Sequence, residues 1–236
     1  MMQVETHCHT KDVSICGKVS AVDAVRLYDR AGYKMIILTD HYYEYFWDSP
    51  KIKRRPWEKK IEAYLAGYRA AKEMGEKLGI TVLQGMEIQF DQYKPYDFLV
   101  YGPDEQFLLD HPYLNQLSPA EFHGICLRND FLMFQAHPYR YDKAPVQPIV
   151  YDGIEVYNAH PRHNSHNRLA VHFAREHGLK LISGSDFHKE EDCGRGGIML
   201  PEDIRTMREF IDYYKENSAP ELIITFEGEP RKGDLQ

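Results

Sequence analysis

Residues 2–10 read MQVETHCHT, a short apolar start followed by two histidines on either side of a cysteine. If this segment is a β-strand, His7 and His9 point to the same face, because residues two apart on a strand share a face. Two imidazoles side by side at a strand end are either a metal site or a coincidence. The rest of the sequence has to decide between these two readings.

Size and composition fit one α/β domain. The chain has 236 residues, a length that single α/β barrels reach. The net charge is -7 and the basic residues are scattered, which argues against non-specific binding to nucleic acid or to an anionic membrane. We therefore expect one domain over residues 1–236, a small diffusing substrate, no nucleic acid as a stable partner and no membrane. No pattern indicates an oligomeric state.

Targeting signals and paired cysteines are not evident. No apolar run approaches the roughly 20 residues that span a bilayer, and the start lacks the layout of a signal peptide, so a cytoplasmic protein is expected. The cysteines show no CxxC spacing, so neither a disulfide framework nor a structural zinc knuckle is predicted. Twelve histidines are many for this length, and they direct attention to metal binding.

Short apolar runs alternate with helical patterns along the chain. Strands are expected at 35–39, 80–88, 97–102, 131–135, 153–159, 179–186 and 221–227, and helices at 20–32, 57–78, 118–129, 165–178 and 201–218. The helix at 118–129 has the clearest start, with Ser118, Pro119 and Glu121 in a capping-box arrangement. Strands separated by helices favour a mainly parallel sheet, open or closed into a barrel. Residues 41–57, rich in aromatics and with two prolines, are typical of a long lid or binding loop.

Ionisable residues collect where these strands end. TDH (39–41) ends one strand, Glu87 lies late in another, His137 follows FLMFQ, and Asp186 and His188 follow LKLISG. The carboxyl ends of parallel strands open onto one face, so these stretches should converge. Imidazole and carboxylate together hold divalent zinc, manganese or iron. The predicted ligands are His7, His9, His41, Glu87, His137, Asp186 and His188.

Each of these motifs also has an ordinary explanation. One His-x-His pair is weak evidence, Asp and His are common turn residues after a strand, and Glu87 could be a charge on a solvated strand edge. What predicts a metal centre is the placement of all the motifs at five strand ends together.

Taken in order, HCH (7–9), TDH (39–41), GME (85–87), AHP (136–138) and SDFH (185–188) resemble the motifs of the PHP superfamily, the polymerase and histidinol phosphatase domain. The resemblance extends from residue 4 to about residue 190. It implies a distorted (β/α)7 TIM-like barrel with mainly parallel strands, outer helices and up to three metal ions at the carboxyl ends of the strands. It also implies phosphoesterase activity, as in most free-standing members.

The resemblance divides the ligands among three metal positions. The first would be held by His7, His9, Glu87 and Asp186, the second by Glu87 as a bridge together with His137, and the third by His41 and His188. The implied cofactors are therefore two or three divalent ions per chain, of zinc, manganese or iron.

Two departures from the family pattern bear on the number of ions. Cys16 stands where an aspartate or histidine is common; a thiolate is a competent zinc ligand, and a buried, inert thiol is the alternative. The strand at 97–102 lacks the histidine that family members usually place there for the second metal. The metal count depends on these two positions.

Further residues near the motifs are candidates for catalysis and substrate binding. His188 or His41 would transfer protons where not committed to metal, and Asp40 is placed to orient a neighbouring ligand. Arg140 and Arg195 lie next to motif loops and are suited to clamp phosphate oxygens, with backbone N–H groups of GRGG (194–197) adding to them. His160 follows the strand at 153–159 and is a third substrate-binding candidate.

We therefore predict a metal-dependent phosphoesterase that hydrolyses a small phosphorylated metabolite, a phosphomonoester such as histidinol phosphate or a nucleotide. The first alternative is a metal-dependent amidohydrolase; these enzymes typically carry a lysine between the metals, and no lysine here stands at a suitable strand end. The second alternative is a metal-binding PHP module that has lost catalysis.

Overall fold

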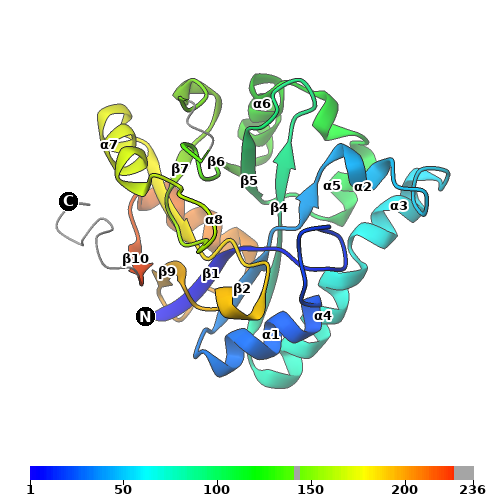
Figure 1. Ribbon diagram of the computed structural model, residues 1–236, viewed down its shortest axis with the longest axis horizontal. Helices are drawn as coiled ribbons and strands as arrows, with labels where there is room; N and C mark the ends of the chain where they lie inside the picture. Colours follow the sequence, from blue (N-terminus) through cyan, green and yellow to red (C-terminus); the bar gives the residue numbers. More distant parts are fainter. Residues whose placement is uncertain (141–143, 226–236) are drawn as a thin grey trace.

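A curved sheet forms a nearly closed barrel in the computed structural model, which describes residues 1–140 and 144–225, and helices surround it (Figure 1). Across the sheet the strands are β10 (Glu221–Ile224), β9 (Gly196–Leu200), β1 (Met2–Cys8), β2 (Met35–Leu38), β4 (Thr81–Gln89), β5 (Asp97–Tyr101), β6 (Leu132–Gln135), β7 (Gly153–Asn158) and β8 (Lys180–Gly184). The short β3 (His41–Tyr42) pairs with β4. The predicted barrel-like α/β fold is confirmed.

Strand β1 pairs with β9 and β2, and it also contacts the segment after β8, the last strand in the sheet order. Its first residues pair antiparallel with β9, and its other edge pairs parallel with β2. Its carboxyl end also meets the segment after β8: Phe187 N donates to His7 O at 3.1 Å, and His9 N donates to Phe187 O at 2.9 Å. This contact places the HCH motif directly beside the SDFH motif, although 176 positions separate Cys8 from Gly184 at the end of β8.

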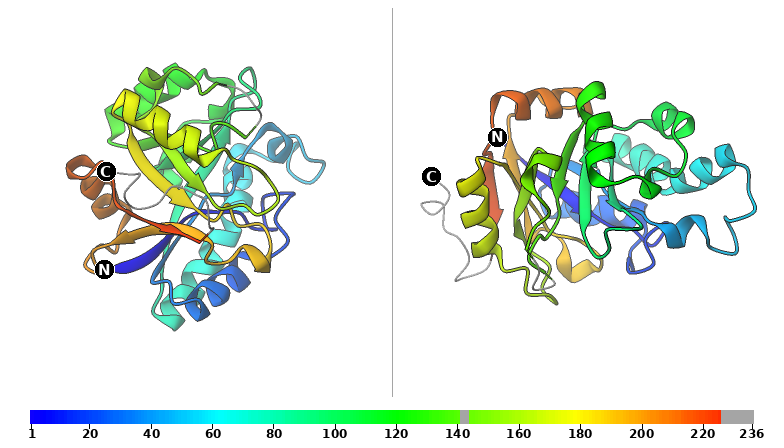
Figure 2. Two further views of the ribbon diagram at one scale, coloured as in Figure 1. Left: turned by 60° about the vertical axis from the view of Figure 1, so that its left-hand side comes forward. Right: turned by 90° about the horizontal axis from the view of Figure 1, so that it is seen from above.

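Helices cover the outside of the barrel and one of its ends. Helices α1 (Ala21–Arg30) and α4 (Ala66–Leu78) pack on β2 and β4 through small residues such as Ala24 and Ala71. Figure 2 shows α7 (Asn167–His177) and α8 (Met207–Glu216) on one side and α2 (Glu44–Trp47) and α3 (Trp57–Tyr64) extending from the other. Phe210 and Tyr214 of α8 join the apolar cluster of the barrel interior. No helix in residues 1–140 and 144–225 is long and apolar enough to cross a membrane.

Several predicted elements follow the sequence signals closely. Helix α6 (Pro119–Asn129) begins with the expected capping box between Ser118 and Glu121, and α1 begins with Ser20 accepting from Asp23 N. The short helices α5 (Glu105–Asp110), η1 (Leu114–Gln116), η2 (Pro148–Val150) and η3 (Glu190–Asp192) lie in connections. The last predicted strand, 221–227, is β10 up to Ile224, and its final two positions lie outside the described residues.

The helix predicted over 57–78 is wrong in its continuity. The chain breaks at Leu65 into α3 and α4, where Leu65 has φ -90° and ψ -2°. Leu65 packs in the same apolar cluster as Phe46 and Trp47 of the preceding segment. The aromatic residues of 41–57 are therefore mostly core, and the break lets the chain follow that core. The long loop predicted over this segment is corrected in its first part, which forms β3 and α2.

The expectation of a mainly parallel sheet is corrected at two places. Strand β5 runs antiparallel to both β4 and β6, and β9, which the sequence patterns did not predict, runs antiparallel to β1 and β10. The connection between β4 and β5 covers only residues 90–96, which is shorter than the dozen or more residues of a parallel crossover. That length was the available signal for the reversed strand.

The GRGG run (194–197) does not form an anion-binding turn. It leads into β9 at a point where the backbones of β9 and β8 pack closely together. Gly196 and Gly197 begin β9, and their N–H groups donate to the hydroxyls of Ser185 and Ser183. A Cβ built on Gly196 would stand 2.4 Å from the Gly184 carbonyl oxygen. Glycine is required here because the backbones of β8 and β9 approach so closely.

Because β8 and β9 lie so close together, we expect a large steric cost when one methyl group is added at Gly196. Gly196→Ala should lower the free energy of unfolding by about 2 kcal/mol or more, because the new Cβ meets backbone that cannot yield. Urea denaturation measures this change. Gly79→Ala is the matched control: a Cβ added at Gly79, where φ is +75°, would meet no heavy atom within 4 Å, so only the left-handed strain of about 1 kcal/mol applies. Equal losses in the two variants would contradict the steric explanation.

Candidate metal centre

The motif side chains converge in a pocket of about 350 Å³ at the carboxyl end of the barrel. Strands β3, β4, β5 and the loops after β1, β6, β7 and β8 all contribute to its wall. The lining residues are Cys16, His41, Tyr43, Glu87, Gln89, Asp97, His137, Arg140, His160, Arg162, His163, Asp186, His188 and Lys189. His7 and His9 lie fully buried beneath them. All of the predicted metal ligands therefore come together, as the spacing of the motifs required.

The first ligand group consists of His7, His9, Glu87 and Asp186. His7 Nε2 lies 2.9 Å from His9 Nε2, 3.3 Å from Glu87 Oε1 and 3.4 Å from Asp186 Oδ1, and His9 Nε2 lies 3.3 Å from Asp186 Oδ1. Ligands about 2.1 Å from one ion stand about 3.0–3.4 Å from each other. The donor atoms are therefore spaced to share a single cation.

The protonation of the two histidines also fits a cation. Burial acts to lower the pKa of His7, but the charges of Glu155 and Asp186 raise it well above its ordinary value. Burial and the neighbouring His41 and His188 instead lower the pKa of His9 well below it. The lowered pKa leaves His9 with the free lone pair that a metal ligand needs, and the negative charge that raises the pKa of His7 also attracts a cation.

Glu87 occupies the middle of the centre. Its Oε1 lies 3.1 Å from His137 Nε2, and its Oε2 lies 3.1 Å from His41 Nε2. Burial acts to raise the pKa of Glu87, but hydrogen bonds from His137, His41 and His7 hold it well below its usual range. An ionised carboxylate with its two oxygens directed to different imidazoles is suited to bridge two ions.

A second ligand group contains Asp97, which the sequence interpretation missed. Glu87, Asp97 and His137 offer donor atoms within 4.8 Å of one another. Because β5 is antiparallel, its first residue and not its last lies at the carboxyl end of the barrel. Asp97 therefore supplies a carboxylate from the strand in which the family resemblance led us to look for a histidine. Burial and the charge of Glu87 raise the pKa of Asp97 to about 6, as expected where carboxylates crowd without a cation.

A third ligand group combines three imidazoles with a thiol. His9, His41 and His188 offer nitrogens within 4.8 Å of one another, and Cys16 Sγ lies 3.8 Å from His41 Nδ1. Burial acts to raise the pKa of Cys16, but hydrogen bonds with His188 and His41 lower it to about 6. Cys16 is exposed and lines the pocket, so it is not the buried thiol that the sequence left as an alternative.

Glu155 of β7 supports two ligands and carried no motif in the sequence. It accepts from His7 Nδ1, from His137 N and from Asn158 Nδ2, each at 2.9 Å. With Nδ1 of His7 held by a carboxylate, Nε2 is directed to the other ligands. The backbone at His137 and at Asp186 has φ of +27° and +49°, a strained conformation typical of functional sites.

Asp40 lies outside the pocket, in a position to orient a neighbouring ligand as the sequence suggested. Its carboxylate accepts from Thr10 N, Thr10 Oγ1 and Ser14 Oγ, each at 2.7 Å, and it does not line the pocket. Ser14 Oγ in turn accepts from His41 N at 3.0 Å. Asp40 thus fixes the loop after β1 to the loop after β2. It orients His41 through Ser14 and is a positioning residue.

Cationic side chains form one wall of the pocket. Arg140 Nη2 donates to Asn158 Oδ1 at 2.9 Å and also bonds Asp186 Oδ2, while its buried Nε has no partner. Arg162 forms a fork with Asp192 at 2.6 and 2.7 Å, and Lys189 lies beside it. Two of the predicted substrate-binding residues, Arg140 and His160, lie in the pocket.

Arg195 lies outside the pocket, whereas His160 lies in it as a neutral side chain. Arg195 does not line the pocket, because the residues that follow it enter β9. Burial lowers the pKa of His160 to about 3, and His160 Nε2 lies 3.1 Å from Arg162 Nη2. His160 is therefore a neutral acceptor beside the arginines, with its ring 5.2 Å from that of His188.

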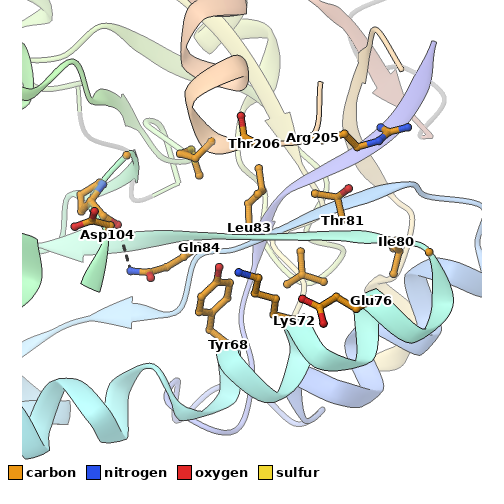
Figure 3. Close-up of a pocket in the computed structure, with 16 residues that line it drawn as sticks. Tyr68, Lys72, Glu76, Ile80, Thr81, Leu83, Gln84, Asp104, Arg205 and Thr206 are labelled. Atoms are coloured by element: carbon orange, nitrogen blue, oxygen red, sulfur yellow. Dashed lines mark hydrogen bonds between the residues drawn. The ribbon is translucent and has the colours of Figure 1, made fainter. Parts of the chain in front are cut away.

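A larger cavity of about 590 Å³ lies at the opposite end of β4 (Figure 3). Lys72 and Glu76 of α4 line it from one side, and Arg205 and Thr206 from the other. No set of three or more His, Cys, Asp or Glu side chains that could hold a metal ion lies there among the described residues. The smaller pocket is therefore the candidate metal site, because the candidate ligands converge there.

Comparisons with known proteins agree with this geometry. A family model described as PHP-associated matches residues 164–219, which include α7, β8, β9 and α8 and the SDFH motif. No significant match was found among curated protein sequences. Solved structures of similar fold were found, at 13–22% identity.

Three of these structures show the range of proteins with this fold. A two-domain protein from Bacteroides vulgatus that contains a predicted PHP-like metal-dependent phosphoesterase has 22% identity and a TM-score of 0.55, covering 92% of this chain and 56% of that one. An amidohydrolase from Chromobacterium violaceum has 16% identity and a TM-score of 0.56, with coverages of 89% and 96%. The lesion-specific endonuclease of Pyrococcus furiosus has 13% identity and a TM-score of 0.56, with coverages of 94% and 57%.

These matches confirm the resemblance to the PHP superfamily. The chain spans little more than half the length of the Bacteroides and Pyrococcus proteins. Because the three structures carry names of different hydrolases, the likeness shows the fold and does not select one reaction. The choice of scissile bond depends on the pocket.

We expect Glu155 to affect metal affinity through His7, without contacting the ion itself. Glu155→Gln should weaken metal binding about 10- to 100-fold, because the neutral amide no longer holds Nδ1 of His7 as a carboxylate does. Competition with a chelator of known affinity, followed by metal analysis, measures the change. Glu121→Gln, at the exposed start of α6, is the control. Wild-type metal retention in Glu155→Gln would show that the contact has no influence on the site.

Proposed function

We propose that this chain is a metal-dependent phosphoesterase that hydrolyses a small phosphorylated substrate, a phosphomonoester such as histidinol phosphate or a nucleotide. The observation that carries the proposal is the juxtaposition of three ligand groups with a cationic wall in one pocket. Phosphate esters need both: cations at the reacting phosphorus and positive side chains on the remaining oxygens.

The chain supplies the donor atoms for such ions. His7, His9, Glu87 and Asp186 would hold one ion, and Glu87 would extend to a second with Asp97 and His137. Divalent ions in such sites stabilise the charge of an in-line displacement at phosphorus and lower the pKa of water. The number of ions, two or three, and their identity as zinc, manganese or iron are part of the proposal.

The remaining pocket residues would bind and orient the substrate. Arg140 and Arg162 offer planar guanidinium groups, which suit phosphate oxygens. His188 Nδ1 bonds the Asp186 carbonyl at 2.7 Å, which leaves Nε2 for an ion or for proton transfer. A pocket of about 350 Å³ lies in the range that holds a small metabolite.

An amidohydrolase remains the second candidate, because a protein named as one shares this fold. Two-metal amidohydrolases typically place a lysine between the ions. Lys189 does line this pocket, but its Nζ lies 3.9 Å from Glu191 Oε1 at the rim, away from Glu87. Glu87 holds the central bridging position instead, which favours the phosphoesterase.

The bond that is cleaved can be tested directly. Metal-loaded protein should hydrolyse p-nitrophenyl phosphate and lose that activity with a chelator, whereas p-nitroacetanilide should remain intact. A panel of phosphorylated metabolites and diesters then identifies the substrate class. Cleavage of the anilide alone would favour the amidohydrolase, and retention of metal without hydrolysis of any phosphate ester would favour a catalytically inactive module.

Removing one central ligand should abolish turnover. His9→Ala should reduce kcat about 1000-fold or more, because metal-derived stabilisation of several kcal/mol is lost. Steady-state kinetics with saturating metal measure the effect, and circular dichroism checks the fold. His172→Ala, exposed on α7, should leave kcat unchanged. Undiminished turnover in His9→Ala would disprove the assignment of this pocket as the active site.

A further inference from the structure

We propose that the two ends of this metal centre differ in metal preference: the Cys16 end selects a thiophilic ion such as Zn²⁺, and the Asp97 end accepts a harder ion such as Mn²⁺. The inference uses the metal centre of the proposed function, but it concerns which ion each end holds. It would stand for a centre that cleaves a different bond.

The Cys16 end is rich in nitrogen and sulfur. The group of His9, His41 and His188 contains three imidazoles, and Cys16 Sγ lies 3.8 and 3.9 Å from the two ring nitrogens of His41. Cys16 is exposed and lines the pocket, so an ion can reach its sulfur from solvent. Thiolate and imidazole together are typical zinc ligands.

The Asp97 end is rich in oxygen. Glu87 and Asp97 contribute two carboxylates and His137 one imidazole, and the Tyr43 hydroxyl lies 2.8 Å from Glu87 Oε2 and 2.7 Å from Asp97 Oδ1. Gln89 Nε2 also donates to Asp97 Oδ1 at 2.7 Å, which leaves Oδ2 on the side of His137, 3.8 Å from its Nε2. Carboxylate and hydroxyl oxygens suit manganese and magnesium better than they suit a soft ion.

The two ends are linked but chemically separate. Glu87 joins them, with Oε1 beside His137 and Oε2 beside His41, so it does not distinguish between them. The difference therefore comes from Cys16 on one side and Asp97 on the other. Replacing the ligand atom at Cys16 or at Asp97 should change the metal preference of that end and leave the metal site at the other end intact.

A zinc titration tests this difference. Zinc outcompetes manganese at most sites, so Zn²⁺ is titrated into full-length protein that is kept in excess Mn²⁺, and both metals are measured after desalting. At low free zinc, wild type should take up one equivalent of zinc more than Cys16→Asp, and the Asp97 end should retain manganese until much more zinc is present. Cys16→Asp should lose this equivalent, with about tenfold or more weaker zinc uptake, and Asp97→His should gain a further zinc equivalent at low free zinc.

Cobalt gives an independent readout that does not depend on activity. Co²⁺-loaded wild type should show a thiolate-to-cobalt charge-transfer band in the near ultraviolet. The band should vanish in Cys16→Asp and in Cys16→Ser, and persist in Asp97→His and in Cys193→Ser, a half-buried thiol outside the pocket. Circular dichroism confirms that each variant is folded.

Two results would overturn the inference. One is a cobalt-loaded wild type that lacks the band, and the other is an identical zinc and manganese distribution in wild type, Cys16→Asp and Asp97→His. If either occurs while p-nitrophenyl phosphate is still hydrolysed, this inference fails and the proposed function stands. If the metals distribute as expected without phosphate-ester hydrolysis, the proposed function fails and this inference stands.

Discussion

The pairing of β1 with the segment after β8 is the contact on which the site depends. The two backbone hydrogen bonds between Phe187 and the residues His7 and His9 draw the first and last motifs together. Glycine makes this closure possible, because Gly184 lies so near His7 that a Cβ there would stand 2.4 Å from the His7 Cβ. Without this closure, the two imidazoles of HCH would have no carboxylate from SDFH beside them, and the first ligand group would be incomplete.

Closure concentrates negative charge where water is excluded. Glu87, Asp97, Glu155 and Asp186 are all buried at the same end of the barrel. Burying carboxylates is costly unless they are paired. In this site the neighbouring histidines and Arg140 offset part of that cost, and a bound cation would offset more. The raised pKa of Asp97, at about 6, is the clearest mark of charge that burial and Glu87 leave uncompensated. The same charge that opposes folding of the metal-free chain favours a divalent cation within the pocket.

Sequence patterns predicted that the seven motif residues would converge, and the structure brings them together, because the carboxyl ends of the strands meet at one end of the barrel. They failed where the answer depended on the direction of a strand or on which residues lie close together in the folded chain. Asp97 was overlooked because only a histidine was sought in the strand at 97–102, and Glu155 because it lies within an apolar strand with no motif around it. Arg195 was placed near the chemistry by its neighbours in sequence, but it lies outside the pocket.

The sequence by itself determined the alternation of strands and helices, the helix caps at Ser20 and Ser118, and the chemical types of the metal ligands. These are local properties, set by periodicity, by side-chain hydrogen bonds within a turn and by the identity of each residue. Only the tertiary structure decided the reversed direction of β5, the insertion of β9 beside β1 and the division of donors into an end with Cys16 and an end with Asp97. Strand pairing joins residues far apart in the chain, and no short stretch of sequence specifies which edges meet.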